Sequence, residues 1–176
     1  MYLLEHSFSE TVNDGDISDE SFLLGIFSTM EKAEEAILHY KTQPGFKDYP
    51  DGFTIVGFKV DEHFCNDDII LPKGVTNIKG YMDDSENAEV AKEYPVFLLQ
   101  HYVEYDEGGS TCEETRNLGI YSSWEKGIQA KTHYKAMKGF KDLPDACFYL
   151  EGWKPDEDKE WTEGFVTVDD DEPSGE

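Results

Sequence analysis

Two stretches of the chain show the same order of apolar and polar segments. Each opens with a run of aromatic and aliphatic residues, YLLEHSF at 2–8 and VFLLQHYVEY at 96–105, as expected for a buried strand. A polar stretch follows in each, at Asn13–Ser21 and at Asp106–Asn117, and is typical of a hairpin loop leading to a second strand. The pattern predicts an antiparallel strand pair at the start of each stretch.

A helix is predicted after each strand pair. Ser28 is followed by Glu31, and Ser122 by Glu125, in the order of a capping box that satisfies first-turn amides. The next glycine in each stretch is expected to end the helix, and a Pro- and Asp-containing turn leads to a last strand. These glycines are Gly45 and Gly139, and the last strands are expected at 53–58 and 148–153.

The two stretches also match in sequence, over residues 2–65 and 97–165, with corresponding blocks about 94–95 residues apart. The paired blocks are YLLEH with FLLQH, LLGIFSTMEKA with NLGIYSSWEKG, HYKTQPGFKDYPD with HYKAMKGFKDLPD, and FTIVGF with FYLEGW. We interpret this as a tandem duplication. The predicted fold class is α+β, with two tandem β-β-α-β modules, antiparallel sheets each with one packed helix, arranged as a pseudo-dimer.

The predicted duplication divides the chain into four segments. The first module is expected at 1–65 and the second at 96–165. An acidic linker containing Pro72, Gly74 and Gly80 is predicted at 66–95, with room for one short helix. Residues 166–176 end in DDDEPSGE and are expected to form a disordered acidic tail.

The strongly negative net charge of the chain limits the kinds of partner that it is expected to bind. The chain has 39 Asp and Glu against 15 Lys and Arg, a formal net charge of -24. Such a surface repels nucleic acid and speeds association with a cationic protein. The alternative is that the carboxylates only maintain solubility.

The remaining composition indicates a protein of the cytoplasm. Cys65, Cys112 and Cys147 are an odd number and lack the paired spacing of a zinc site, which fits a reducing compartment. No segment reads as a signal peptide or reaches membrane-spanning length. We therefore expect no membrane association, and a monomer with internal pseudo-symmetry, with a dimer as the alternative.

No catalytic motif is found in the sequence. GxSxG, P-loop, GxGxxG and HExxH patterns do not occur, so we expect no enzyme, no cofactor and no metal. His6 and His101 correspond between the modules, but no second ligand lies at metal spacing, and each is interpreted as a strand histidine with one solvated nitrogen.

Acidic loops and one tryptophan are the candidate partner-binding residues. Trp161 lies in DEDKEWTEGF, and an aromatic ring among carboxylates suits a binding hot spot, although packing on the second helix is an alternative. The candidate residues are Asp14, Asp16, Asp19, Glu20, Glu107, Glu113, Glu114, Asp158, Glu160, Trp161 and Glu163.

The motifs YLLEH, LGIFSxxEKA, GFKDYPDGF and WTEGF resemble a small bacterial family of domains of unknown function that usually occur as single modules. The resemblance implies no activity and no catalytic residue. In that family WTEGF follows the last strand, so the second module keeps it and the first does not.

Size, acidity and the duplicated modules are also similar to toxin-immunity proteins, by analogy only. The sequence thus favours an acidic, non-enzymatic binding protein, most concretely a bacterial immunity or inhibitor protein that covers a basic surface of a toxin. The alternatives are an acidic scaffold or regulatory interaction protein, a nucleic-acid mimic, or an enzyme of unrecognised type.

Overall fold

The computed structural model describes residues 1–11, 17–64, 76–80, 90–107 and 110–166. The chain divides into two compact units. The first unit combines Tyr2–Gly57 with the residues from Asp156 onward, and the second combines Met1 with Phe58–Pro155. Each unit is described by itself. The predicted module and linker boundaries stay predictions, and most of the predicted linker and tail lies outside the described residues.

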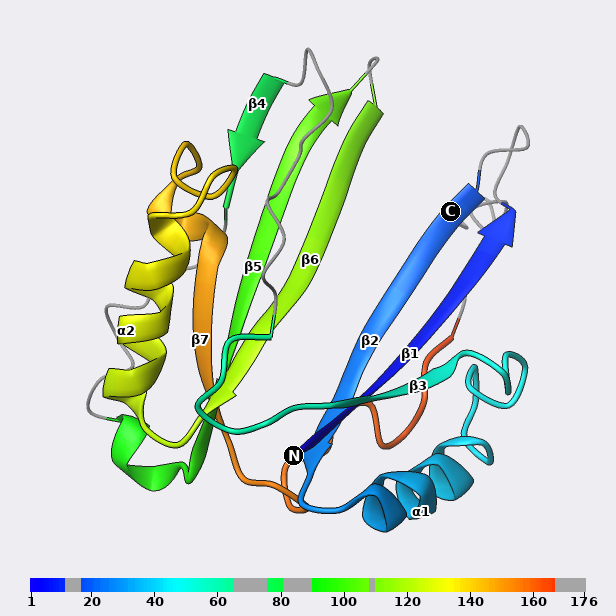
Figure 1. The fold of residues 1–176 in the computed structure, drawn as a ribbon. Coiled ribbons are helices and arrows are strands. Elements are labelled where there is room, and N and C mark those ends of the chain that lie inside the picture. Colours follow the sequence, from blue (N-terminus) through cyan, green and yellow to red (C-terminus); the bar gives the residue numbers. More distant parts are fainter. Residues whose placement is uncertain (12–16, 65–75, 81–89, 108–109, 167–176) are drawn as a thin grey trace. The chain divides into compact units, whose positions relative to one another are not determined.

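The first unit contains a three-stranded antiparallel sheet and one helix (Figure 1). The strands are β1 (Tyr2–Thr11), β2 (Ile17–Phe27) and β3 (Phe53–Gly57), in the order β2-β1-β3. Helix α1 (Met30–Tyr40) follows β2 and packs on the sheet through Ala33 and Tyr40, which are both buried.

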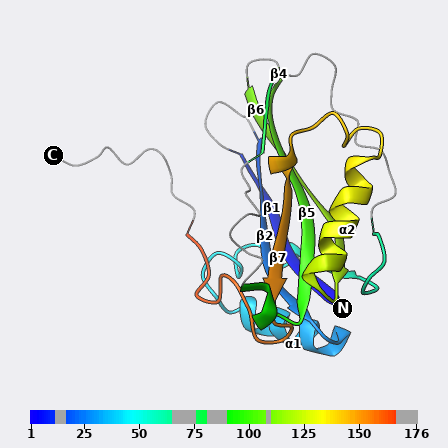
Figure 2. The same cartoon turned by 90° about the vertical axis from the view of Figure 1, so that its left-hand side faces the viewer.

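The second unit contains a four-stranded antiparallel sheet, and its helix lies along the sheet (Figure 2). Strand β5 (Val96–Glu107) pairs with β6 (Ser110–Tyr121) and also with β7 (Phe148–Trp153) and β4 (Thr76–Lys79). Helix α2 spans Trp124–Lys135, and 3₁₀ turns lie at Val90–Glu93 and Asp145–Cys147. Two antiparallel sheets, each with a packed helix, confirm the predicted α+β class. Strand β4 falls inside the segment that was expected to be a linker.

The hairpins are longer than expected. Residues 17–21 and 110–117, which were predicted as loops, belong to β2 and β6. Their backbones pair with β1 and β5, so Ser9 lies opposite Asp19 and Glu104 opposite Glu113. The loop prediction was wrong because it relied on side-chain polarity, and a ladder of backbone hydrogen bonds tolerates polar side chains on a solvated face.

The helix starts also differ from the prediction by one residue. The N-caps are Thr29 and Ser123, whose hydroxyls accept from the amides of Lys32 and Lys126, so the residue three positions on is a lysine and no capping box forms. The helices end before the expected glycines. Those glycines, Gly45 at φ 77° and Gly139 at φ 90°, instead form the left-handed positions of the turns that follow.

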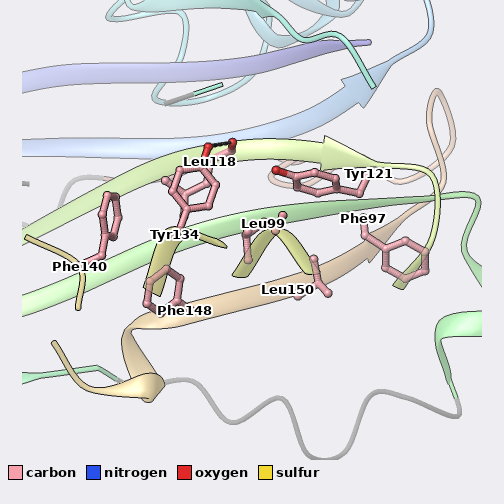
Figure 3. Packing of buried hydrophobic residues seen from close by; sticks show 9 residues of the cluster. Phe97, Leu99, Leu118, Tyr121, Tyr134, Phe140, Phe148 and Leu150 are labelled. Atoms are coloured by element: carbon pink, nitrogen blue, oxygen red, sulfur yellow. Dashed lines mark hydrogen bonds between the residues drawn. The ribbon is translucent and has the colours of Figure 1, made fainter. Parts of the chain in front are cut away.

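Each core is built from large rings and aliphatic side chains between helix and sheet. In the second unit a buried tyrosine ties the helix to the sheet, because the Tyr134 hydroxyl donates to the Leu118 carbonyl at 2.7 Å (Figure 3). Gly127 of α2 stands where Ala33 stands in α1. A Cβ atom at Gly127 would lie 2.6 Å from the Leu150 side chain, so the close packing of helix and sheet requires a glycine there. The second core consists of Phe97, Leu99, Leu118, Tyr121, Ala130, Tyr134, Phe140, Phe148 and Leu150.

The two strand histidines are fully buried, which corrects the expectation of a solvated nitrogen. Among the described residues His6 makes one hydrogen bond, from its Nε2 to the Tyr49 carbonyl at 2.8 Å, whereas neither ring nitrogen of His101 has a hydrogen-bond partner. Phe140 and Phe148 pack edge-on against the His101 ring. Burial, with a smaller effect of the Arg116 charge, lowers the pKa of His101 to about 4.

The buried His101 predicts a loss of stability in mild acid. Because its pKa is lower in the folded chain than the usual 6.5, the unfolded chain takes up the proton first, and stability falls as the pH decreases from about 6.5 to about 4. Between pH 7 and pH 5 this amounts to about 2 kcal/mol. We expect His101→Leu to reduce the pH-dependent loss by that amount in urea unfolding, and Leu38→Ala, at an exposed site without a titratable group, to leave it unchanged. An unchanged loss in His101→Leu would contradict a buried neutral imidazole.

Candidate functional site

Each sheet is flanked by the segment that follows the last strand of the other predicted module. We call residues 156–165 the C-terminal strap and residues 61–64 the central strap. In the first unit, the Asp156 and Glu160 amides of the C-terminal strap donate to the Ile26 and Leu24 carbonyls of β2, at 2.9 and 3.0 Å. The central strap runs along β6 in the same way.

In the second unit, the Asp61 amide donates to the Ile120 carbonyl and the Phe64 amide to the Leu118 carbonyl, both at 2.9 Å. Each strap therefore continues the backbone pairing of the strand that leads into a helix. The bonds fix the strap at its start and three or four residues later.

An aspartate at the start of each strap holds the beginning of the helix. The Asp156 carboxylate accepts from the Ser28 amide at 2.9 Å, the Ser28 hydroxyl at 2.8 Å and the Lys32 ammonium at 2.7 Å. Asp61 makes the same three bonds with Ser122 and Lys126, at 2.8, 2.9 and 2.5 Å. The serines that were expected to cap the helices are thus bound by a carboxylate from a distant part of the sequence.

Both aspartates have left-handed backbones, with φ of 72° at Asp156 and 67° at Asp61. Aspartate tolerates this region better than most residues. Partial burial alone raises the pKa of each carboxyl, but the bonds from the lysine and serine outweigh burial and hold both pKa values below the ordinary range. The carboxylates therefore stay ionised at neutral pH.

The middle of the C-terminal strap covers a buried tyrosine. The Tyr40 hydroxyl donates to the Glu160 carbonyl at 2.7 Å and lies 3.1 Å from the Leu24 carbonyl oxygen. Burial, together with the nearby Glu160 charge, raises the pKa of Tyr40 to about 12. One phenol thus joins α1, β2 and the strap.

The strap ends in a tight turn that exposes Trp161. The Gly164 amide donates to the Trp161 carbonyl at 2.9 Å, and the Phe165 amide donates to the Pro44 carbonyl at 3.1 Å. Trp161 has φ 57°, an uncommon value for a bulky residue, and its side chain is 47% exposed. Its ring lies against Phe22 of β2, with centroids 4.6 Å apart, so the alternative packing on the second helix was wrong.

Phe165 anchors this turn in the first core. Its ring stacks on Phe8 at 5.1 Å and meets Phe46 edge-on at 4.9 Å. Gly45 leaves the room for it, since a Cβ atom on that glycine would lie 2.6 Å from the Phe165 carbonyl oxygen. Trp161 is therefore held on a fixed support.

The candidate partner-binding residues divide between the two units. Trp161 packs on Phe22, and Glu20 lies two residues earlier on the same face of β2, so the structure brings the strap and this carboxylate to one side of the first sheet. In the first unit lie Asp19, Glu20, Asp158, Glu160, Trp161 and Glu163. In the second unit lie Glu107, Glu113 and Glu114. Asp14 and Asp16 lie outside the described residues.

Pairing and exposure distinguish these carboxylates. Glu20, Glu160 and Glu163 are exposed, and Glu113 is exposed on β6. Asp19 accepts from the Ser9 hydroxyl at 2.5 Å. Glu114 is less available for a partner because it forms an ion pair with Arg116.

The sequence analysis did not identify Asp61, Asp156 or His63. A repeated pattern does mark the two aspartates, because Gly57 and Gly152 each begin the order glycine, aromatic, Lys, any residue, Asp, Glu, in GFKVDE and GWKPDE. The repeated blocks that we compared ended at the aromatic residue of this pattern.

In the described ranges, no group of three or more His, Cys, Asp or Glu residues is placed to hold a metal ion. Cys112 and Cys147 are free thiols, and Cys65 lies outside the described residues. No helix in the part of the chain that the structure describes is long and apolar enough to cross a membrane.

Comparison with known proteins identifies one domain. Residues 1–69 match the family model of a domain of unknown function (DUF7336). This range includes the whole predicted first module and the central strap. The comparisons with curated proteins and with solved structures found no match.

The clamp at the helix start predicts a measurable loss of stability on its removal. Asp156→Ala leaves the Ser28 amide and the Lys32 ammonium without this acceptor, and we expect the free energy of unfolding to fall by about 1–2 kcal/mol. Asp61→Ala is expected to act similarly in the second unit. Urea unfolding is the measurement, and Glu157→Ala, at the exposed neighbouring position, is the control. Equal stability of Asp156→Ala and Glu157→Ala would disprove the clamp.

Proposed function

We propose that the protein is a non-enzymatic binding protein that covers a basic surface of a partner protein. Most concretely, it is an immunity or inhibitor protein for a basic toxin. The observation that carries the proposal is Trp161, a half-exposed ring on a rigid turn among exposed carboxylates.

The conformation of Trp161 supports a binding role. A bulky residue with φ 57° costs on the order of 1–3 kcal/mol and persists only where the surroundings impose it. Here the bond from Gly164 and the packing of the partly buried Phe165 impose it, and the result is an aromatic ring turned partly to solvent. Tryptophan is enriched among binding hot spots because it buries a large area with little loss of side-chain entropy.

The surrounding charge supports a cationic partner. Glu160 and Glu163 flank the tryptophan along the strap, and Glu20 lies on the neighbouring strand face. With a net charge of -24, the field of the whole protein accelerates encounters with a positive surface, and this effect weakens as salt rises.

The two aspartates that hold the helix starts are unsuited to general acid catalysis. Asp61 and Asp156 have lowered pKa values because cationic and amide donors surround them. A general acid needs the opposite shift, toward or above neutral pH. These carboxylates act as permanent hydrogen-bond acceptors, which is a structural role.

We also propose that the two modules arose by tandem duplication in a bacterial, cytoplasmic protein. The shared strand, strand, helix, strand order supports this, as do the paired Asp61 and Asp156 clamps. The register shifts also correspond, since both strand pairs change register after the third residue of the match, at Leu4 and at Leu99.

The proposal predicts salt-sensitive capture of a basic protein that depends on Trp161. We expect the wild-type chain to retain one basic protein stoichiometrically from its native host at low salt and to release it at high salt. With that protein purified, calorimetry is expected to show binding at least tenfold weaker for Trp161→Ala. Glu160→Gln and Glu163→Gln are each expected to reduce the association rate and its salt dependence.

Leu38→Ala is the matched control, because Leu38 is another exposed apolar residue of the first unit, at 70% exposure. It is expected to leave binding unchanged. Failure to capture any basic protein, or equal binding by the Trp161 and Leu38 variants, would overturn the proposal.

A further inference from the structure

A pocket lies between α1 and the C-terminal strap, within the first unit. Its volume is about 350 Å³, within the size range of small-ligand sites. It differs from the acidic surface around Trp161 because basic and aromatic groups contribute much of its wall. Its lining includes Phe27, Lys32, Glu35, His39, Asp156 and Lys159.

In the second unit, an aromatic ring occupies the corresponding place. The His63 ring of the central strap stacks on the His133 ring of α2, with centroids 4.3 Å apart and planes only 3° from parallel. Its Nδ1 lies 3.0 Å from the Tyr121 hydroxyl. A flat ring carried by the strap therefore stacks on the face of the helix histidine.

The backbone bonds show which residue replaces His63 in the first unit. Phe64 donates to the Leu118 carbonyl and Glu160 donates to the Leu24 carbonyl, so the residues just before them, His63 and Lys159, hold equivalent positions. The Lys159 ammonium lies over the Phe27 ring, 5.9 Å from its centroid. A lysine chain thus stands where a ring stands in the second unit, and the pocket lies beside His39.

Two lysines line the pocket, of which Lys32 is already paired and Lys159 is available to bind an anionic ligand. Lys32 is engaged by Asp156 at 2.7 Å, which neutralises both. Lys159 makes no ion pair within the described part of the chain, although the protein carries a large excess of carboxylates. Glu35 also lines the pocket, but its side chain is exposed to water, which screens its repulsion of an anion.

We propose that this pocket binds a planar aromatic carboxylate. The ring of the ligand stacks on His39 in the manner of His63 on His133, and its carboxylate contacts the Lys159 ammonium. Phe27 supplies an apolar wall for the ring. Planarity and negative charge are both required, because the histidine face recognises the first and the lysine the second.

Benzoate is the probe, and the NMR signals of the histidine rings are the readout. Stacking is expected to shift the His39 ring protons upfield, saturably and at millimolar benzoate. The His133 signals are an internal control and are expected to stay unchanged, because His63 already covers that ring. Benzamide lacks the charge and cyclohexanecarboxylate lacks the planar ring, so each is expected to bind at least fivefold more weakly than benzoate.

Three variants test the assignment of groups. Lys159→Met is expected to weaken benzoate binding at least fivefold, and Glu35→Gln to strengthen it. Lys159→His places a ring where His63 stands in the second unit and is expected to abolish binding while shifting the His39 signals in the absence of benzoate. The inference is wrong if benzoate leaves the His39 signals unmoved, if it shifts His39 and His133 alike, or if Lys159→Met binds as the wild type does. Lys159 and Glu35 are both exposed, so their substitution is not expected to disturb the core. An unchanged circular dichroism spectrum verifies that each variant is folded.

Discussion

The contact between an ionised aspartate and the start of a helix is the constraint on which the rest of the structure depends. Asp156 in the first unit and Asp61 in the second each accept three hydrogen bonds from a serine and a lysine. These bonds satisfy an amide next to the helix and fix the path of the strap. Because the strap then pairs with the last residues of β2 or β6, it closes the open side of the core beneath the helix.

The candidate sites follow from the path of the C-terminal strap. After the Asp156 clamp, the strap covers Tyr40, turns at Trp161 and inserts Phe165 among the aromatic rings of the first core. The exposed tryptophan and the pocket beside His39 therefore lie on two parts of one anchored segment. In the second unit, the His63 ring of the central strap stacks on His133 in the place where the first unit has its pocket. The two units therefore share a scaffold but differ in the surfaces that they offer to a partner.

Local pattern was sufficient to predict the strand, strand, helix, strand order of each module but not the added strand β4, because alternation, turn residues and apolar spacing act over a few positions. Local pattern was insufficient where a segment far away in the sequence determines the contacts of a residue. Ser28 looked like an N-cap because nothing near it shows that Asp156 binds its amide, and the true cap is Thr29. His101 looked half-solvated because its burial depends on Phe140 and Phe148, some 40 residues away in the chain. Trp161 was identified as a candidate from its neighbours, but its support on Phe22 depends on the tertiary fold.

Hydrogen–deuterium exchange on a chain that ends at Pro155 tests most directly whether the C-terminal strap completes the first unit. Without the strap, the Asp156 clamp and the cover over Tyr40 are both absent, while every described contact of α2 with the central strap remains. We expect the amides of α1 to exchange at least tenfold faster than in the full chain, with those of α2 unchanged. Equal protection of α1 in the two chains would show that the C-terminal strap does not complete the first unit.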